Sequence, residues 1–176
     1  MIGNDIVDLH LAENESRIHR RGFLDKLFLP GEQTMIRSAA DPTVMVWLLW
    51  SCKESAYKII HRATHERKFA PQQFSCRLWQ LDNNIATGTV TYQQQVYYFR
   101  SHYIGSCIHT CAAVTPQLLQ ELTVFTTYRL SDLPLFYKDE YGIPYTRERC
   151  SGAMLPVSVS HHGKYTGGIF LAGNKY

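Results

Sequence analysis

Residues 74–114, FSCRLWQLDNNIATGTVTYQQQVYYFRSHYIGSCIHTCAAV, have the sequence pattern of a β-sheet. From Phe74 onward, apolar and polar side chains alternate with the period of a half-buried strand. The polar residues at 82–84 form a turn signal, and short connections join neighbouring strands in antiparallel order. The stretch therefore predicts a four-stranded antiparallel meander. Its strands are expected at residues 74–79, 85–92, 96–103 and 107–114.

A long helix precedes the meander. Asp41 is a suitable N-cap and Pro42 a suitable first helical residue, and the apolar pattern continues to about His61. The first two turns are apolar on all sides, which indicates burial. In the last turns Glu54, Lys58 and His61 follow one another at spacings of four and three, so they share one stripe. A polar stripe on a buried helix is a place where a functional site can form.

Shorter elements surround the helix and the meander. Residues 2–11 predict a buried strand or extended segment, and Pro30-Gly31 is expected to end a short helix that begins at Phe23. The other expected elements are helices at 32–38 and 116–124, a turn at 139–144, and a hairpin of strands at 157–161 and 167–172. Short helices with a mainly antiparallel sheet predict an α+β fold.

Length and composition exclude several classes of protein. A chain of 176 residues fits one domain, here residues 1–176. Its longest apolar run, 44–50, is far too short to span a membrane, and the N-terminus has no signal-peptide pattern. A net charge of +3 does not by itself indicate nucleic acid binding. The five cysteines are odd in number and scattered, which is typical of reduced thiols in a cytoplasmic protein. They are Cys52, Cys76, Cys107, Cys111 and Cys150.

A cluster of basic residues lies near the start of the chain. It consists of Arg17, His19, Arg20, Arg21 and Lys26. Such a cluster could bind an acidic partner or phosphates, or it could be a solvated basic face.

Polar residues in apolar surroundings suggest one chemistry. Asp5 could cap or turn the chain, and Glu54 with Lys58 could be an ordinary helical ion pair. Magnesium, however, is typically held by one or two carboxylates together with substrate phosphates. Asp5 and Glu54 could supply that pair. Lys53, Lys58 and His161 would then balance the remaining phosphate charge, as in a phosphoryl-type transfer site.

A second metal site is conceivable on the meander. Its candidate ligands are His102, Cys107, His109 and Cys111. The spacing is not C-x-x-C, and small buried thiols are common on strands, so a zinc site is the weaker alternative.

Three segments resemble motifs of the 4′-phosphopantetheinyl transferase superfamily. Trp50–Lys58, WSCKESAYK, resembles the family signature W-(S/A)-x-K-E-(S/A)-x-x-K. Gly3–Leu9, GNDIVDL, resembles the opening G-x-D-I-V-E-I, and Val157–His161, VSVSH, resembles S-I-S-H. The motif order is that of the compact holo-acyl-carrier-protein synthase type. Residues 1–130 also resemble the C-terminal half of the longer surfactin-synthetase-activating type, so the chain is similar to the compact type with a meander insertion at about 82–134.

The resemblance implies an activity and its partners. The family moves 4′-phosphopantetheine from coenzyme A to a serine of an acyl or peptidyl carrier protein and releases 3′,5′-ADP. Fatty acid synthesis is the expected setting, with polyketide and peptide synthesis as alternatives, and neither nucleic acid nor membrane binding is expected. In the compact type the site lies between subunits, commonly of a trimer. One S-x-S-H motif per chain fits such a site, because a neighbouring copy would complete it.

The resemblance also implies roles for individual residues. Asp5 and Glu54 would bind Mg²⁺, or Mn²⁺, with the coenzyme A pyrophosphate. Glu54 would help to deprotonate the carrier serine, and Lys58 would stabilise or protonate the departing 3′,5′-ADP. Coenzyme A contacts are expected from Lys53, Lys58, Ser160 and His161.

Some residues differ from the family pattern. Val7 stands where the longer type has a third acidic metal ligand, so a water would take the place of that ligand. Arginines of the compact type are replaced at Leu11 and Leu49, and a lysine of the G-K-P turn is replaced by Ile143. The charge that binds the 3′-phosphate could then come from Arg17, Lys138 or Lys164.

Two other functions remain open: a non-catalytic carrier-protein or nucleotide-binding module, and a metal-dependent pyrophosphohydrolase.

Overall fold

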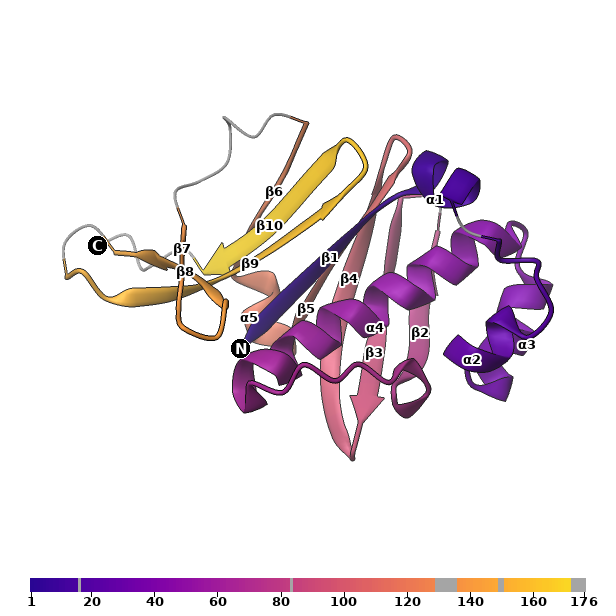
Figure 1. The fold of residues 1–176 in the computed structure, drawn as a ribbon, viewed down its shortest axis with the longest axis horizontal. Helices are drawn as coiled ribbons and strands as arrows, with labels where there is room; N and C mark the ends of the chain where they lie inside the picture. The colour runs from indigo at the N-terminus through magenta and orange to yellow at the C-terminus, as the bar shows by residue number, and fades with distance from the viewer. Residues whose placement is uncertain (16, 83, 129–135, 149–150, 172–176) are drawn as a thin grey trace.

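Two five-stranded antiparallel sheets form the framework of the protein (Figure 1). The computed structural model describes residues 1–15, 17–82, 84–128, 136–148 and 151–171. The first sheet has the order β1 (Ile2–Asp8), β5 (Cys107–Ala113), β4 (Gln95–Ile104), β3 (Ile85–Tyr92), β2 (Ser75–Leu81). The second has the order β6 (Leu122–Thr127), β10 (Tyr165–Leu171), β9 (Met154–His162), β8 (Pro144–Arg147), β7 (Tyr137–Lys138). The predicted α+β class, the meander β2–β5 and the hairpin β9–β10 are confirmed.

One long helix lies across a face of the first sheet (Figure 1). This helix, α4 (Pro42–Thr64), begins as predicted, because the Asp41 carboxylate accepts a hydrogen bond from the Val44 amide at 3.0 Å. It ends where His65 adopts a left-handed conformation with φ of 61°. The other helices are α1 (Leu9–Glu15), α2 (Phe23–Leu27), α3 (Pro30–Ser38), α5 (Pro116–Gln120) and the 3₁₀ turn Pro71–Gln73. None of the helices in the described ranges is long and apolar enough to cross a bilayer.

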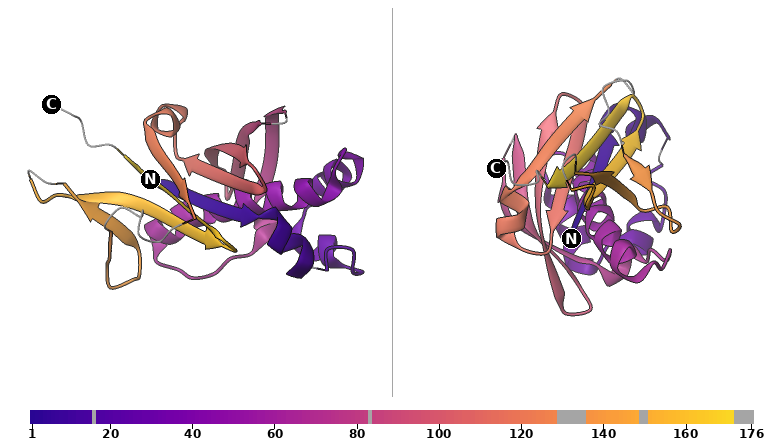
Figure 2. Two further views of the ribbon diagram at one scale, coloured as in Figure 1. Left: turned by 90° about the horizontal axis from the view of Figure 1, so that it is seen from above. Right: turned by 90° about the vertical axis from the view of Figure 1, so that its left-hand side faces the viewer.

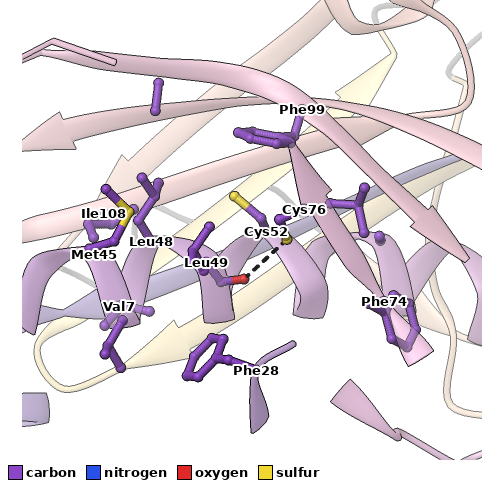
Figure 3. Close-up of a cluster of buried hydrophobic side chains, with 14 of the residues drawn as sticks. Val7, Phe28, Met45, Leu48, Leu49, Cys52, Phe74, Cys76, Phe99 and Ile108 are labelled. Carbon is purple, nitrogen blue, oxygen red and sulfur yellow. Dashed lines mark hydrogen bonds between the residues drawn. The ribbon is translucent and has the colours of Figure 1, made fainter. Parts of the chain in front are cut away.

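The apolar face of α4 fixes the helix against the sheet. Figure 3 shows Leu48, Leu49 and Cys52 of α4 close to Phe99 of β4 and Phe28, all of them nearly or fully buried. Each large apolar side chain buried in this way contributes about 1.5–3 kcal/mol. The four described cysteines are buried and free, and Cys150 lies outside the described residues. This packing determines which stripe of α4 points toward β1.

Three predicted boundaries are wrong. The strand at the N-terminus ends at Asp8 because its carboxylate caps the amides of His10 and Leu11 and starts α1. Pro30 is the first residue of α3, a position where proline loses no hydrogen bond. The helix expected at 116–124 ends at Gln120, because the β-branched segment that follows pairs with β10 as strand β6.

The two sheets meet where β1 lies beside β9 (Figure 2). β1 is an edge strand, and alternate backbone amides along its open edge donate to side chains of β9. The contacts are Asn4 N to Ser158 Oγ at 3.0 Å, Ile6 N to Ser160 Oγ at 3.3 Å and Asp8 N to His162 Nδ1 at 2.9 Å. Both strands advance by two residues at each contact, so β9 runs parallel to β1. We call this the β1–β9 seam.

Candidate functional site

Three elements bring polar side chains together at the β1–β9 seam. Asp5 comes from β1, Lys58 from α4 and Ser160 from β9. The Ser160 hydroxyl donates to Asp5 Oδ1 at 2.9 Å, and Lys58 Nζ donates to the same oxygen at 3.3 Å. Lys58 Nζ also donates to Ser160 Oγ at 3.0 Å and to the carbonyl of Asn4 at 2.7 Å. The side chain of Lys58 remains 28% exposed, so the group opens to solvent.

Glu54 lies one helical turn before Lys58, on the same side of α4. Burial raises the pKa of its carboxyl group, the negative charge of Asp5 raises it further, and Lys58 lowers it in part, leaving the pKa at about 7. The charge of Asp5 is therefore close enough to act on Glu54. Residues 49 positions apart in the chain, predicted as a pair, are thus brought to one place.

The donor chemistry of this place fits a divalent cation. Glu54 makes no hydrogen bond to any residue that the structure describes, and the hydrogen bonds of Asp5 go to Oδ1. Across the described residues, no three His, Cys, Asp or Glu side chains gather in a metal-binding cluster. A cation held here would therefore have two carboxylate ligands from the protein, and water or phosphate would complete its shell. Such a shell is typical of Mg²⁺.

Gly3 allows β1 to approach α4 closely. A Cβ atom at this position would lie 2.2 Å from the backbone oxygen of Ser55 and 3.2 Å from Cβ of Lys58. Atoms cannot approach this closely without displacing one of the two elements. The small residue at the start of the first motif therefore allows Lys58 to reach the backbone of β1.

Lys53 lies elsewhere. Its side chain is fully buried, and Nζ contacts Glu32 at 2.6 Å and the carbonyls of Leu27 and Pro71 at 3.0 and 2.9 Å. Glu32 in turn accepts from the amides of Leu29 and Cys76. Lys53 therefore has a structural role: it holds α3 and the turn at Pro71 against α4. This placement does not support the predicted contact of Lys53 with coenzyme A.

His161 also lies apart from the carboxylates. Ser160 and His162 face β1, and alternate side chains of a strand point to opposite faces, so His161 points away and is exposed. Its predicted contact with coenzyme A stays a prediction. The same alternation explains a role of Ser160 that the sequence reasoning missed, which is to orient Asp5. The signal was the serine at every second position of the third motif.

The candidate zinc residues do not converge in the described structure. Both ring nitrogens of His109 are occupied, Nε2 by the Asn4 side chain at 3.0 Å and Nδ1 by Thr126 Oγ1 at 2.9 Å. Burial, helped by the charges of His102 and Lys58, lowers the pKa of His109 to about 4. His109 is therefore a neutral core residue that links β5 to β1 and β6.

A single chain brings the third motif to the first two. Ser160 contacts both Asp5 and Lys58 of the same chain. The third motif can therefore reach the first two without a neighbouring copy, and the trimer stays a prediction.

Comparison with known protein families identifies the family of this chain. A family model described as the 4′-phosphopantetheinyl transferase superfamily matches residues 1–114 of the 176. The matched part contains Asp5, Glu54 and Lys58, whereas Ser160 lies beyond it. No curated protein sequence is a significant match.

Proposed function

Because the chain belongs to the 4′-phosphopantetheinyl transferase superfamily, we propose that it transfers 4′-phosphopantetheine from coenzyme A to a serine of an acyl or peptidyl carrier protein. The observation that carries the proposal is the convergence of Asp5, Glu54 and Lys58 at the β1–β9 seam. A protein that only bound a carrier or a nucleotide would not need two mutually repelling carboxylates beside a lysine.

In the proposed reaction the serine oxygen of the carrier forms a bond to the phosphorus that bears pantetheine. The bond from that phosphorus to the bridging oxygen of the pyrophosphate breaks, and 3′,5′-ADP leaves. The serine proton passes to Glu54, directly or through a water. A carboxylate whose pKa is about 7 is well matched to accept a proton near neutral pH.

Asp5 and Glu54 would hold the divalent cation, for which Mg²⁺ is our proposal. The cation would neutralise charge that develops on the pyrophosphate oxygens. Ser160 holds the Asp5 carboxylate in place by donating to Oδ1. Lys58 stabilises the negative charge of the departing 3′,5′-ADP, because its ammonium group is the cation nearest to Asp5 in the described structure.

The experiment is incubation of the protein with coenzyme A, Mg²⁺ and an apo acyl carrier protein, followed by mass spectrometry of the carrier. The proposal predicts a mass increase of one phosphopantetheine group on the carrier. An unmodified carrier together with free phosphopantetheine, formed even without a carrier, would indicate a pyrophosphohydrolase. If acyl and peptidyl carriers both stay unmodified and coenzyme A stays intact, the protein is a binding module and the proposal fails.

A further inference from the structure

The ammonium group of Lys58 is held by three acceptors at different distances. It donates to the backbone carbonyl of Asn4 at 2.7 Å, to Ser160 Oγ at 3.0 Å and to Asp5 Oδ1 at 3.3 Å. An ammonium group has three N–H donors, so these contacts use all of them. The carbonyl of Asn4 makes the shortest contact and belongs to the backbone. It is therefore the acceptor that fixes where Lys58 lies.

Asn4 is itself held by three neighbouring strands. Its side-chain nitrogen donates to the carbonyl of Gly167 in β10 at 3.0 Å and lies 3.0 Å from Nε2 of His109 in β5. Its backbone amide donates to Ser158 Oγ of β9 at 3.0 Å. The carbonyl that receives Lys58 is therefore positioned by β5, β9 and β10.

The hydrogen bond between Asn4 and His109 has a definite direction. The carbonyl of Gly167 can only accept, so Asn4 presents its amide nitrogen there, and Nε2 of His109 must accept from the same nitrogen. The proton of the ring then lies on Nδ1 and is donated to Thr126 Oγ1 at 2.9 Å. Burial lowers the pKa of His109 to about 4, so the ring keeps this neutral form near neutral pH.

This polar pair is not the most stable way to fill the space beside β1. Oδ1 of Asn4 is buried and makes no hydrogen bond to any residue in the described ranges. Buried polar atoms are usually paired, and apolar side chains of the same shape often serve a core equally well. The ring of His109 also requires a glycine at 167, where a Cβ atom would lie 2.9 Å from Cε1 of the ring. These features point to a role at the neighbouring site.

We propose that Asn4 and His109 are positioning residues for the transfer reaction, which hold the Asn4 carbonyl where it anchors the ammonium group of Lys58. The inference rests on the proposed function, in which Lys58 stabilises the departing 3′,5′-ADP. The side chains of Asn4 and His109 act only through Lys58, because the two residues are 0% and 1% exposed and cannot reach a substrate. If the carbonyl shifts, Lys58 is misplaced against the leaving group, and the rate suffers more than substrate binding does.

The test is a double-mutant cycle between His109 and Lys58 in the full chain, with coenzyme A, Mg²⁺ and an apo carrier protein. His109→Leu removes the acceptor of the Asn4 amide and should lower kcat by roughly tenfold, with the KM for coenzyme A nearly unchanged. His109→Gln again offers an acceptor and should recover most of the rate. In the Lys58→Ala background, His109→Leu should have almost no further effect, because both changes remove the same contact.

Two further variants make the cycle decisive. Gln33→Leu is the control, because Gln33 is also buried and donates to the carbonyl of Phe28 at 3.1 Å, but lies in α3, away from the seam (Figure 1). It should lower stability and leave kcat of the folded protein unchanged. Thr126→Val removes only the outer hydrogen bond of His109, and it enters the same cycle if His109→Leu does not fold. It should lower kcat severalfold, and only when Lys58 is present.

A second measurement follows Lys58 without any transfer. Acetylation of Lys58 by acetic anhydride, compared with the exposed Lys68, should rise severalfold in His109→Leu and fall back in His109→Gln. Wild-type kcat in folded His109→Leu, or the same loss of rate with and without Lys58, would overturn the inference. If the wild-type protein modifies no carrier, the proposed function fails and the labelling decides alone. Equal labelling of Lys58 in wild type and His109→Leu would then show that the pair does not position it.

Discussion

Asp5 and Glu54 differ in how their charges are compensated. Asp5 accepts hydrogen bonds from Lys58 and Ser160. Burial and the charge of Asp5, in contrast, disfavour the ionised form of Glu54. In the proposed reaction this asymmetry suits Asp5 to be an oriented metal ligand and Glu54 to be the group that exchanges a proton near neutral pH. Lys53 and Glu54 are neighbours in the signature. Successive side chains of a helix point about 100° apart around its axis, so the two lie in different surroundings.

The raised pKa of Glu54 predicts how stability depends on pH. Between the ordinary value of 4.5 and about 7, the folded protein holds this proton more tightly than the unfolded chain does. The free energy of unfolding should therefore fall as pH rises through this range. Glu54→Gln removes the titrating group and should make the fall shallower. Chemical denaturation without divalent metal, at several pH values in this range, measures the slope.

The exposed Glu121 provides the control, because Glu121→Gln should leave the slope of the wild type unchanged. An equal slope in wild type and Glu54→Gln would show that Glu54 titrates alike in the folded and unfolded states.

At the scale of elements, the site depends on how β1 lies between α4 and β9. The meander and the long helix could be predicted because their patterns are local and periodic. The β1–β9 seam could not, because it joins residues 154 positions apart through side chains and gives no backbone pairing pattern. Strand β6 was missed for a similar reason, since its residues pair with residues of β10 that lie 39 to 49 positions later.

Gly3 offers a test of the close approach of β1 to α4. Gly3→Ala would place a Cβ atom against the Ser55 carbonyl and should lower the free energy of unfolding by about 1–3 kcal/mol. It should also slow the transfer reaction, because displacement of β1 from α4 would break the contact between Lys58 and Asp5. Gly31→Ala is the matched control. Its Cβ meets no atom within 4 Å, and alanine favours the helix, so stability should rise by up to about 1 kcal/mol.

Denaturant titration of both variants measures these changes. A Gly3→Ala protein as stable and as active as the wild type would mean that the contact between β1 and α4 is not tight in solution.

For the whole molecule, we propose that the basic cluster at residues 17–26 is the surface on which an acidic carrier protein docks. Arg17, Arg20 and Arg21 are exposed, and Arg20 lies over the ring of Phe23 at 5.6 Å. Arg20→Glu with Arg21→Glu should raise the KM for the carrier protein severalfold and leave the KM for coenzyme A nearly unchanged. Arg77→Glu, on the exposed face of β2, should change neither value. Steady-state kinetics with each substrate varied in turn gives both constants, and an unaltered carrier KM in the double variant would place the docking surface elsewhere.

The proposed reaction requires Asp5 and Glu54 to act together on the pyrophosphate of coenzyme A. The most direct measurement is the rate of carrier modification, followed by mass spectrometry at saturating coenzyme A and Mg²⁺, for the wild type, Asp5→Ala, Glu54→Gln and Glu121→Gln. We expect a loss of at least about 10²-fold in Asp5→Ala and Glu54→Gln and a rate close to wild type in Glu121→Gln. A Glu54→Gln protein that folds and modifies the carrier at nearly the wild-type rate would contradict it.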